Sequence, residues 1–239
     1  MLNLGAKVTI ASRKEVPLKK AAEELKEFGP CDYKVCDIRQ TDQIKQLAAQ
    51  IKERHGRLDI LVNNAGGQFP ALAEMINDKG WTAVINNNLN GTFFMIREMA
   101  NAFFIPQNEG TIVNIIVDLY RGFPGMVHTG AARAGVENIT KTLAIEWSDH
   151  RIRLNCVAPG TIESSGLNTY PKPVQDMFDE CRKAIPLKRF GTVEDIANAV
   201  CFLSSPLSAY INGITMYVDG AQHLQYDKMG LPNVLKSFM

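Results

Sequence analysis

The stretch from Gly110 to Gly160 constrains the fold of this chain more than any other. It opens with a short apolar, β-branched run at 111–117 and closes with a second apolar run at 153–158, just before Pro159-Gly160. Such runs are typical of strands buried on both faces. Between them, residues 129–147 carry apolar side chains at helical spacing. The pattern predicts a strand, a crossover helix and a parallel strand, which form one half of a nucleotide-binding sheet.

Strand and helix patterns alternate along the rest of the chain. Short apolar runs predict further strands at 7–12, 32–36, 58–64 and 214–218. Amphipathic segments predict helices at 16–28, 41–55, 81–105 and 192–203. This alternation predicts a single α/β domain over residues 1–239, with a doubly wound, Rossmann-like parallel sheet. Ligands of such sheets bind at the carboxyl ends of the strands, here near 117–120 and 158–161.

Composition argues against several other classes of protein. The net charge is +1, and basic and acidic residues are interspersed, so no nucleic-acid partner is expected. No apolar run reaches the roughly 18 residues of a membrane span. The five cysteines contain no CxxC pair, which predicts reduced core thiols in an intracellular protein. Their spacing also offers no zinc ligand set, so no metal site is expected.

Six short motifs follow one another in a definite order: ASR at 11–13, CDI at 36–38, VNNAG at 62–66, NNLNG at 87–91, IVNI at 112–115 and NCVAPG at 155–160. Their joint order resembles the short-chain dehydrogenase/reductase superfamily over nearly the whole chain. Within it, NNAGGQF at 63–69 and RGFPGMVHTGAARAG at 121–135 resemble the peroxisomal trans-2-enoyl-CoA reductases, and the 2,4-dienoyl-CoA reductases are the next nearest relatives. The resemblance implies NADPH-dependent reduction of trans-2-enoyl-CoA to acyl-CoA in fatty acid metabolism. The alternative is a 2,4-dienoyl-CoA reductase.

The resemblance also implies where a dinucleotide binds. After the second strand of this family, an acidic residue selects NAD and an Arg accommodates the 2′-phosphate of NADP. Arg13 at this position favours NADPH, although Arg13 and Lys14 could simply be solvated residues that open a helix. Asp37 matches the position beside the adenine, and its alternative is a turn or cap residue. The full set implied for the cofactor is Ser12, Arg13, Asp37, Ile38, Asn64, Ala65, Gly66, Arg133, Pro159, Gly160 and Ile162.

The sequence departs from the family pattern at its start. No glycine-rich TGxxxGxG turn, which would hold the pyrophosphate, occurs in the chain. Residues 2–5 instead look like the end of a helix with a glycine cap. We therefore expect roughly 30 residues of a first strand–helix unit to be missing, which would leave two neighbouring strands with unpaired backbone groups. Three explanations for the missing unit stay open: an incomplete gene model, a splice form, or an inactive scaffold that has lost cofactor binding.

The second departure concerns the catalytic residues. Most family members use Asn, Ser, Tyr and Lys. The corresponding positions here are Asn88, Val117, Thr129 and Arg133, with Glu137 and Lys141 as a second pair of the right spacing one turn further on. The family role of Asn88 is to bend its helix and hold a water. Arg133 would hold the nicotinamide ribose and act electrostatically, because it cannot shuttle a proton as Lys does.

Reduction of an enoyl thioester needs a hydrogen bond to the oxygen on which charge develops. Thr129 or Tyr120 could supply it, and Tyr120 lies where dienoyl-CoA reductases place a proton-donating Tyr. A partly buried loop tyrosine is the alternative for Tyr120, and His128 beside this site is taken as a neutral structural residue.

Residues 161–190 are rich in proline and follow the second strand of the central stretch, which predicts a substrate lid. Lys172, Lys183, Lys188 and Arg189 flank it and could meet the phosphates of an acyl-CoA, or could form a solvated helix face. The resemblance implies a dimer or tetramer. It also implies a peroxisomal location, although the C-terminal Ser237-Phe238-Met239 matches the targeting signal poorly and leaves the cytoplasm as the alternative.

Overall fold

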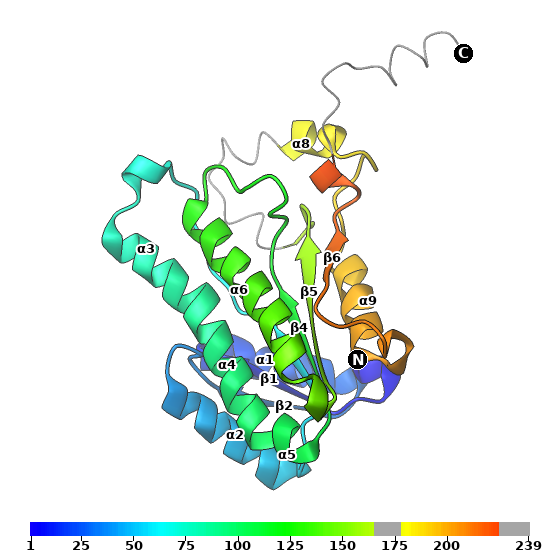
Figure 1. Cartoon of the computed structure of the whole chain (residues 1–239). Coiled ribbons are helices and arrows are strands. Elements are labelled where there is room, and N and C mark those ends of the chain that lie inside the picture. Colours follow the sequence, from blue (N-terminus) through cyan, green and yellow to red (C-terminus); the bar gives the residue numbers. More distant parts are fainter. Residues whose placement is uncertain (165–177, 225–239) are drawn as a thin grey trace, which may run out of the picture.

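The computed structural model describes residues 1–164 and 178–224, which form an α/β fold with parallel strands (Figure 1). The strands are β1 (Val8–Ser12), β2 (Cys31–Val35), β3 (Ile60–Asn63), β4 (Gly110–Ile115), β5 (Ile152–Pro159) and β6 (Thr215–Val218). Strands β3, β4, β5 and β6 form one sheet in that order, and β1 pairs with β2 in a second sheet. Every described strand pair is parallel, as the alternation of strands and helices predicts.

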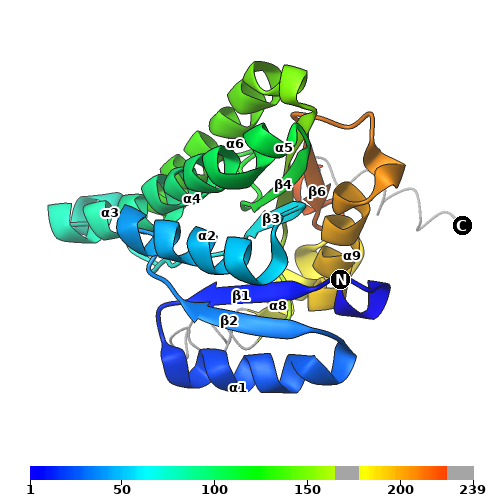
Figure 2. The same cartoon turned by 90° about the horizontal axis from the view of Figure 1, so that it is seen from below.

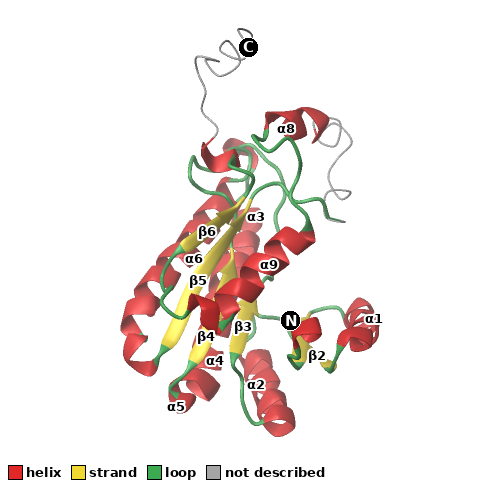
Figure 3. Cartoon of the chain, turned by 90° about the vertical axis from the view of Figure 1, so that its right-hand side faces the viewer, coloured by secondary structure: helices red, strands yellow, loops and turns green. Residues whose placement is uncertain are grey.

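Helices cover both faces of the larger sheet. The helices of the described residues are α1 (Glu15–Leu25), α2 (Thr41–His55), α3 (Asp78–Ile85), α4 (Gly91–Met99), α5 (Ile105–Gln107), α6 (Val127–Glu146), α8 (Phe178–Ala184) and α9 (Val193–Ser204), and only some of them pack on the larger sheet. Helices α4 and α6 lie on one face and α9 on the other (Figure 3). Adjacent side chains of β4 point to opposite faces of the sheet. Ile112 packs in the core on the α4 side, and Val113 packs in the core on the α9 side. This two-sided burial explains why β4 and β5 are apolar almost throughout.

The predicted helix at 81–105 is interrupted in the structure. It consists of α3, a π-helical segment Asn86–Asn90, α4, a second π-helical segment Ala100–Phe104, and the short α5. Its first turn is capped by Asn77, whose side chain accepts a hydrogen bond from the Gly80 N–H at 2.8 Å. A π-helical segment adds a residue to a turn and frequently marks a functional site, so the interruption at Asn86–Asn90 directs attention to Asn88.

The strand order places a gap between β1 and β3. In a doubly wound sheet of order 3-2-1-4-5-6, strands β2 and β1 take the positions 3 and 2, and β3 takes position 4. No strand of the described residues occupies position 1, so β1 and β3 are not paired and the sheet is split in two. Helix α1 runs beside β1 and β2 (Figure 2). Residues Leu2–Leu4 form a 3-10 turn that ends at Gly5 with φ of 86°, as the predicted glycine cap requires.

Candidate active site

Asn88 holds the loop that follows β3. Its side chain is 1% exposed, donates from Nδ2 to the Gly67 carbonyl oxygen at 3.0 Å and accepts at Oδ1 from the Gly67 N–H at 2.9 Å. The Asn87 side chain also donates to this oxygen, at 3.1 Å. Because both ends of the amide are engaged with one residue, Asn88 fixes the loop relative to the π-helical segment.

Arg133 lies on α6 with its guanidinium buried under the same loop. The residue is 6% exposed, and Nη2 donates to the Ala65 carbonyl oxygen at 3.1 Å. Burial lowers the pKa of the Arg133 guanidinium to about 10. Within the described residues, Nε and Nη1 are buried without a hydrogen-bond partner. A β-carbon on Gly66 would lie 2.3 Å from Nη2, so any larger residue would displace the guanidinium from this position.

The unpaired donors of Arg133 show what kind of ligand group this part of the site can accept, and the nicotinamide end of a dinucleotide can be compared with it. An unsatisfied buried N–H costs about 1–3 kcal/mol, and Arg133 has donors on two nitrogens in that condition. The hydroxyl oxygens of a ribose are acceptors of the kind that such donors lack. The residues present therefore fit the ribose of a nicotinamide cofactor, with Arg133 as the group that would hold it.

Thr129 lies in the first turn of α6 and is fully buried beside His128. The Thr129 N–H donates to His128 Nδ1 at 2.8 Å, and the Thr129 Oγ1 lies 3.4 Å from the same nitrogen. Because Nδ1 accepts, the proton of a neutral His128 resides on Nε2. Nε2 is buried without a partner among the described residues, and the Phe69 ring lies edge-on at 4.5 Å. The Thr129 hydroxyl therefore faces His128, which limits its use toward a substrate.

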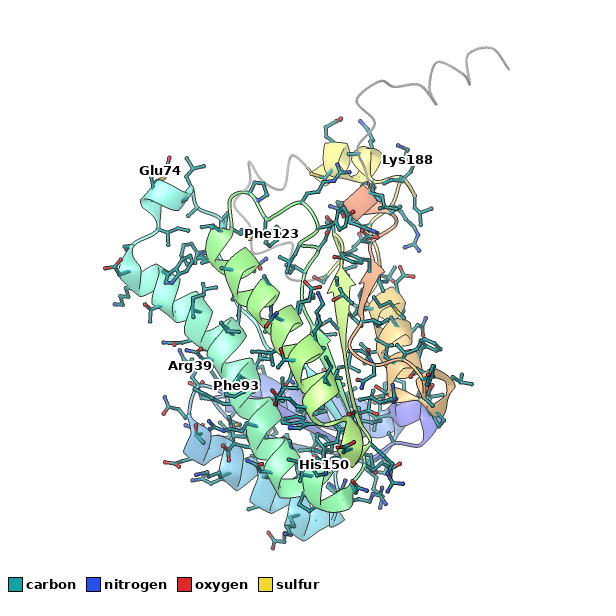
Figure 4. The ribbon with its side chains drawn as sticks, in the orientation of Figure 1. Arg39, Glu74, Phe93, Phe123, His150 and Lys188 are labelled. Atoms are coloured by element: carbon teal, nitrogen blue, oxygen red, sulfur yellow. The ribbon has the colours of Figure 1, made fainter. Side chains whose placement is uncertain are left out.

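Tyr120 lies in the turn after β4 and is 64% exposed. Its N–H donates to Asp118 Oδ1 at 3.1 Å, and the Asp118 N–H donates to the Pro159 carbonyl oxygen at 3.2 Å. These bonds connect the turn to the end of β5. Tyr120 is therefore available at the carboxyl ends of the strands, where a ligand of this fold binds. Phe123, three residues further along this turn, is labelled in Figure 4 and shows where the turn lies.

Glu137 and Lys141 lie further along α6 and form an ion pair of 2.7 Å. The pair is directed toward β6, since Glu137 also accepts from the Thr215 hydroxyl at 3.1 Å. The hydrogen bond from Lys141 to Glu137 raises the pKa of Lys141. The described contacts do not join this pair to Asn88 or to Arg133, so the structure brings Asn88 and Arg133 together and leaves Glu137 and Lys141 apart.

The residues expected at the adenine end gather after β1 and β2. The Ser12 carbonyl oxygen accepts from the Cys36 N–H at 2.9 Å. Asp37 accepts from Arg39 Nε at 2.9 Å, and this side-chain bond is the largest cause that lowers the pKa of Asp37, to which the charge of Arg13 adds. Asp37 is thus ion-paired in a turn. Ile38 packs against Gly91, where a β-carbon would lie 2.7 Å from its side chain.

The end of β5 closes the other side of the site. The Gly160 N–H donates to the Val218 carbonyl oxygen at 3.1 Å, and a β-carbon on Gly160 would lie 2.7 Å from the Asp219 β-carbon. Ile162 forms an isolated bridge with Gly191. Asn64, Ala65 and Gly66 are exposed in the loop after β3, on the neighbouring side of the site.

The predicted lid spans residues 161–190, of which 165–177, including Lys172, lie outside the described residues. Lys183 forms an ion pair within α8 at 2.7 Å, and Lys188 Nζ donates to the Lys183 carbonyl oxygen at 2.7 Å. Arg189 pairs with Asp195 at 2.7 Å. These three basic side chains therefore have partners close in sequence, and Lys188 lies near α8 (Figure 4).

Sequence analysis did not single out Asp219 and His223, which contact each other close to Tyr120. The available signal was an acid and a histidine four residues apart, directly after the last strand. In the described part of the chain, no group of three or more His, Cys, Asp or Glu could hold a metal ion. No helix of residues 1–164 and 178–224 is both long and apolar enough to cross a membrane.

Comparison with known proteins agrees with this architecture. Residues 1–223 match the family described as enoyl-(acyl carrier protein) reductase. A probable 2,4-dienoyl-CoA reductase of Bacillus subtilis (strain 168) is 36% identical over 224 residues, which cover 92% of this chain and 88% of that protein. A 3-oxoacyl-(acyl-carrier-protein) reductase FabG of Thermotoga maritima is 38% identical over 205 residues, which cover 85% and 80% of the two chains.

Among solved structures, a variant of actinorhodin polyketide ketoreductase with NADPH is similar with a TM-score of 0.88 at 27% identity, and the match covers 93% of this chain and 90% of that one. The parallel α/β fold, the matched family and the relatives agree with one another. The chain therefore belongs to the short-chain dehydrogenase/reductase superfamily of oxidoreductases, in the family described as enoyl-(acyl carrier protein) reductase.

Proposed function

We propose that this chain reduces trans-2-enoyl-CoA to acyl-CoA with NADPH. The observation that carries the proposal is the buried guanidinium of Arg133, beside a loop that Asn88 fixes; among residues 1–164 and 178–224, its Nε and Nη1 have no hydrogen-bond partner. Two similar proteins are named for acyl thioester chemistry, a dienoyl-CoA reductase and an acyl-carrier-protein reductase, and these names support a thioester substrate. The exposed Arg13, together with the NADPH of the similar ketoreductase structure, supports the choice of NADPH.

The chain's own residues would divide the work as follows. Bound NADPH supplies the hydride that reaches the β-carbon of the thioester. Arg133 holds the nicotinamide ribose and adds positive potential where the thioester oxygen gains negative charge. Asn88 keeps the loop at Ala65 and Gly66 in place for this contact. Tyr120 donates the proton that the α-carbon requires, and it is preferred to Thr129, whose buried hydroxyl faces His128.

A 2,4-dienoyl-CoA reductase is the second candidate function. The Bacillus subtilis relative and the exposed Tyr120 after β4 both favour it. A catalytically inactive scaffold is a third candidate, from a different class, and the gap between β1 and β3 motivates it.

NADPH oxidation, followed by the loss of its near-ultraviolet absorbance, distinguishes these functions. The substrates are crotonyl-, hexenoyl- and decenoyl-CoA, with 2,4-hexadienoyl- and 2,4-decadienoyl-CoA in parallel. We expect oxidation with the enoyl thioesters and a large loss in Arg133→Met. Two forms are assayed: the chain itself, and the chain with a strand–helix unit of a relative fused before Met1. If neither form oxidises NADPH with an enoyl thioester, the proposed activity is wrong. Activity on dienoyl thioesters alone supports the second candidate, and a missing NADPH thermal shift in both forms supports the scaffold.

We also propose a homo-oligomer, because members of the superfamily to which the chain belongs commonly assemble as dimers or tetramers; the exposed Ile145 on α6 is available for such a contact. Light scattering after size-exclusion chromatography tests this, and a monomeric mass would contradict it.

The peroxisomal location rests on the family resemblance, and a fluorescent fusion with a free C-terminus tests it.

A further inference from the structure

Asp219 and His223 form a buried acid–histidine pair just after β6. The Asp219 side chain is 3% exposed and accepts three hydrogen bonds, from the Ala221 N–H at 3.0 Å, the His223 N–H at 2.7 Å and His223 Nδ1 at 2.7 Å. An ionised carboxylate can only accept, so His223 Nδ1 carries a proton. This leaves His223 Nε2 as the reactive nitrogen, and no hydrogen bond to it occurs among the described residues.

Aromatic contacts fix the plane of the His223 ring. Tyr217 stacks on it with ring centroids 4.3 Å apart and an interplanar angle of 19°. Tyr120 meets it edge-on, at 5.6 Å and 76°. Tyr120 also meets Tyr217 edge-on at 6.4 Å. Three rings, from the turn after β4, from β6 and from the segment after β6, thus meet at the carboxyl end of the sheet, and the chain from 219 to 224 lies above β6 in Figure 1.

The same segment is docked on the end of β5. Gln222 Oε1 accepts from the Thr161 N–H at 3.1 Å and would lie 2.8 Å from a β-carbon on Gly160. Arg121 Nη2 donates to the Leu224 carbonyl oxygen at 3.1 Å, which ties the residue after Tyr120 to this segment. His223 is therefore held next to Tyr120 by contacts on both sides.

We propose that the Asp219–His223 pair supplies protons to Tyr120 and so sets Tyr120 as the proton donor of the reaction; this rests on the proposed function. The Tyr120 O–H bond breaks as a C–H bond forms at the substrate α-carbon, after hydride from NADPH has reached the β-carbon. The Tyr120 oxygen then regains a proton, through a water molecule, from Nε2–H of the His223 imidazolium, whose charge the Asp219 carboxylate balances. Water returns a proton to His223 through its side chain, which is 17% exposed. The substrate gains one hydride and one proton, and NADPH is oxidised.

Kinetics of His223→Ala test the relay, with His150→Ala as the matched control. His150 lies at the opposite end of the molecule from Phe123 (Figure 4). We expect kcat of His223→Ala to fall by about 10²- to 10⁴-fold, as for other lost acid–base groups, with KM for NADPH within about twofold. Added imidazole should restore at least about tenfold of the loss, which a merely structural histidine would not allow. The kcat of Tyr120→Phe should fall to a similar level, and imidazole should not restore it. The kcat of the double variant, with Tyr120→Phe and His223→Ala, should fall no further.

A readout without turnover tests the pair itself. In ¹⁵N–¹H spectra of the wild type, the His223 ring should show a slowly exchanging Nδ1–H that Asp219→Asn abolishes. A neutral His223 protonated only on Nε2 would refute the pair. An active wild type with His223→Ala as active as His150→Ala would refute the relay and leave the reductase function intact. A wild type and fused form that oxidise no NADPH with any thioester would refute both.

Discussion

Arg133 on α6 donates through Nη2 to the carbonyl oxygen of Ala65, 3.1 Å away in the loop after β3. This one bond joins the crossover helix to the loop that Asn88 fixes from the other side. The remaining donors on Nε and Nη1 stay unpaired among the described residues, which is costly for a buried group. Sites at which stability is sacrificed in this way are commonly functional, and the first two predictions follow from this contact.

Gly66→Ala should disturb the contact directly. The added β-carbon would lie 2.3 Å from Arg133 Nη2, so the loop or the guanidinium has to move. Because Nη2 is the far end of a flexible side chain, we expect the guanidinium to shift with little change in the free energy of unfolding, measured by urea denaturation, and NADPH to bind more weakly by calorimetry. Gly67→Ala is the control, because its β-carbon would have its nearest neighbour at 3.4 Å. Equal NADPH affinity of the two variants would contradict the geometry.

Arg133→Met should stabilise the protein in the absence of cofactor. Met is of similar length and removes the unpaired donors, so we expect the free energy of unfolding to rise by about 1–2 kcal/mol while NADPH-dependent activity is lost. Arg153→Met provides the contrast. Arg153 donates to the carbonyl oxygens of Ser208 and Leu203 at 3.0 Å, and its replacement should destabilise the protein. The same urea titrations measure both, and a destabilised Arg133→Met would count against this view of the site.

Asp195 should make the stability of α9 depend on pH. It accepts from Arg189 Nη1 at 2.7 Å and from the Thr192 N–H at 2.8 Å, and these bonds, that from Arg189 first, lower the pKa of Asp195 to about 2. Since this lies below the ordinary value of 3.8, the contribution is complete above about pH 4 and is lost as pH falls toward 2. Asp195→Asn should lower the melting temperature at neutral pH and reduce its change between about pH 5 and pH 2. Asp149→Asn is the control, and it should keep the wild-type dependence.

The gap between β1 and β3 should be visible by hydrogen exchange. Thr111 N–H donates to the Asp59 carbonyl oxygen, and the alternation of a parallel ladder then directs the Val62 N–H away from β4 and into the gap. The N–H of Ala11 on β1 is directed away from β2 for the same reason. We expect both amides to exchange at least about 100-fold faster than that of Val113 in the centre of the larger sheet. Equal protection would mean that the gap is closed in solution.

Sequence alone determined the type and order of the elements, because periodicity and capping are local properties. The helix at 41–55 agrees with α2 at both ends, and Thr192 with Asp195 forms the capping box at the start of α9. The motif order also placed Asn88 and Arg133 at one site, through resemblance to the family. Even the glycine-capped turn at Gly5 is a local signal that the sequence carries.

Only the tertiary structure decided which side chains meet. Sequence spacing made Glu137–Lys141 as good a candidate pair as Thr129–Arg133, but the packing of α6 turns Glu137 toward Thr215 on β6 and buries Arg133 under Ala65. Asp219 and His223 come next to Tyr120 because β6 and β4 end at the same edge of a parallel sheet, a long-range relationship that no local pattern encodes. The unpaired donors of Arg133 depend likewise on what surrounds them in space, and desolvation is a property of the fold and not of the residue.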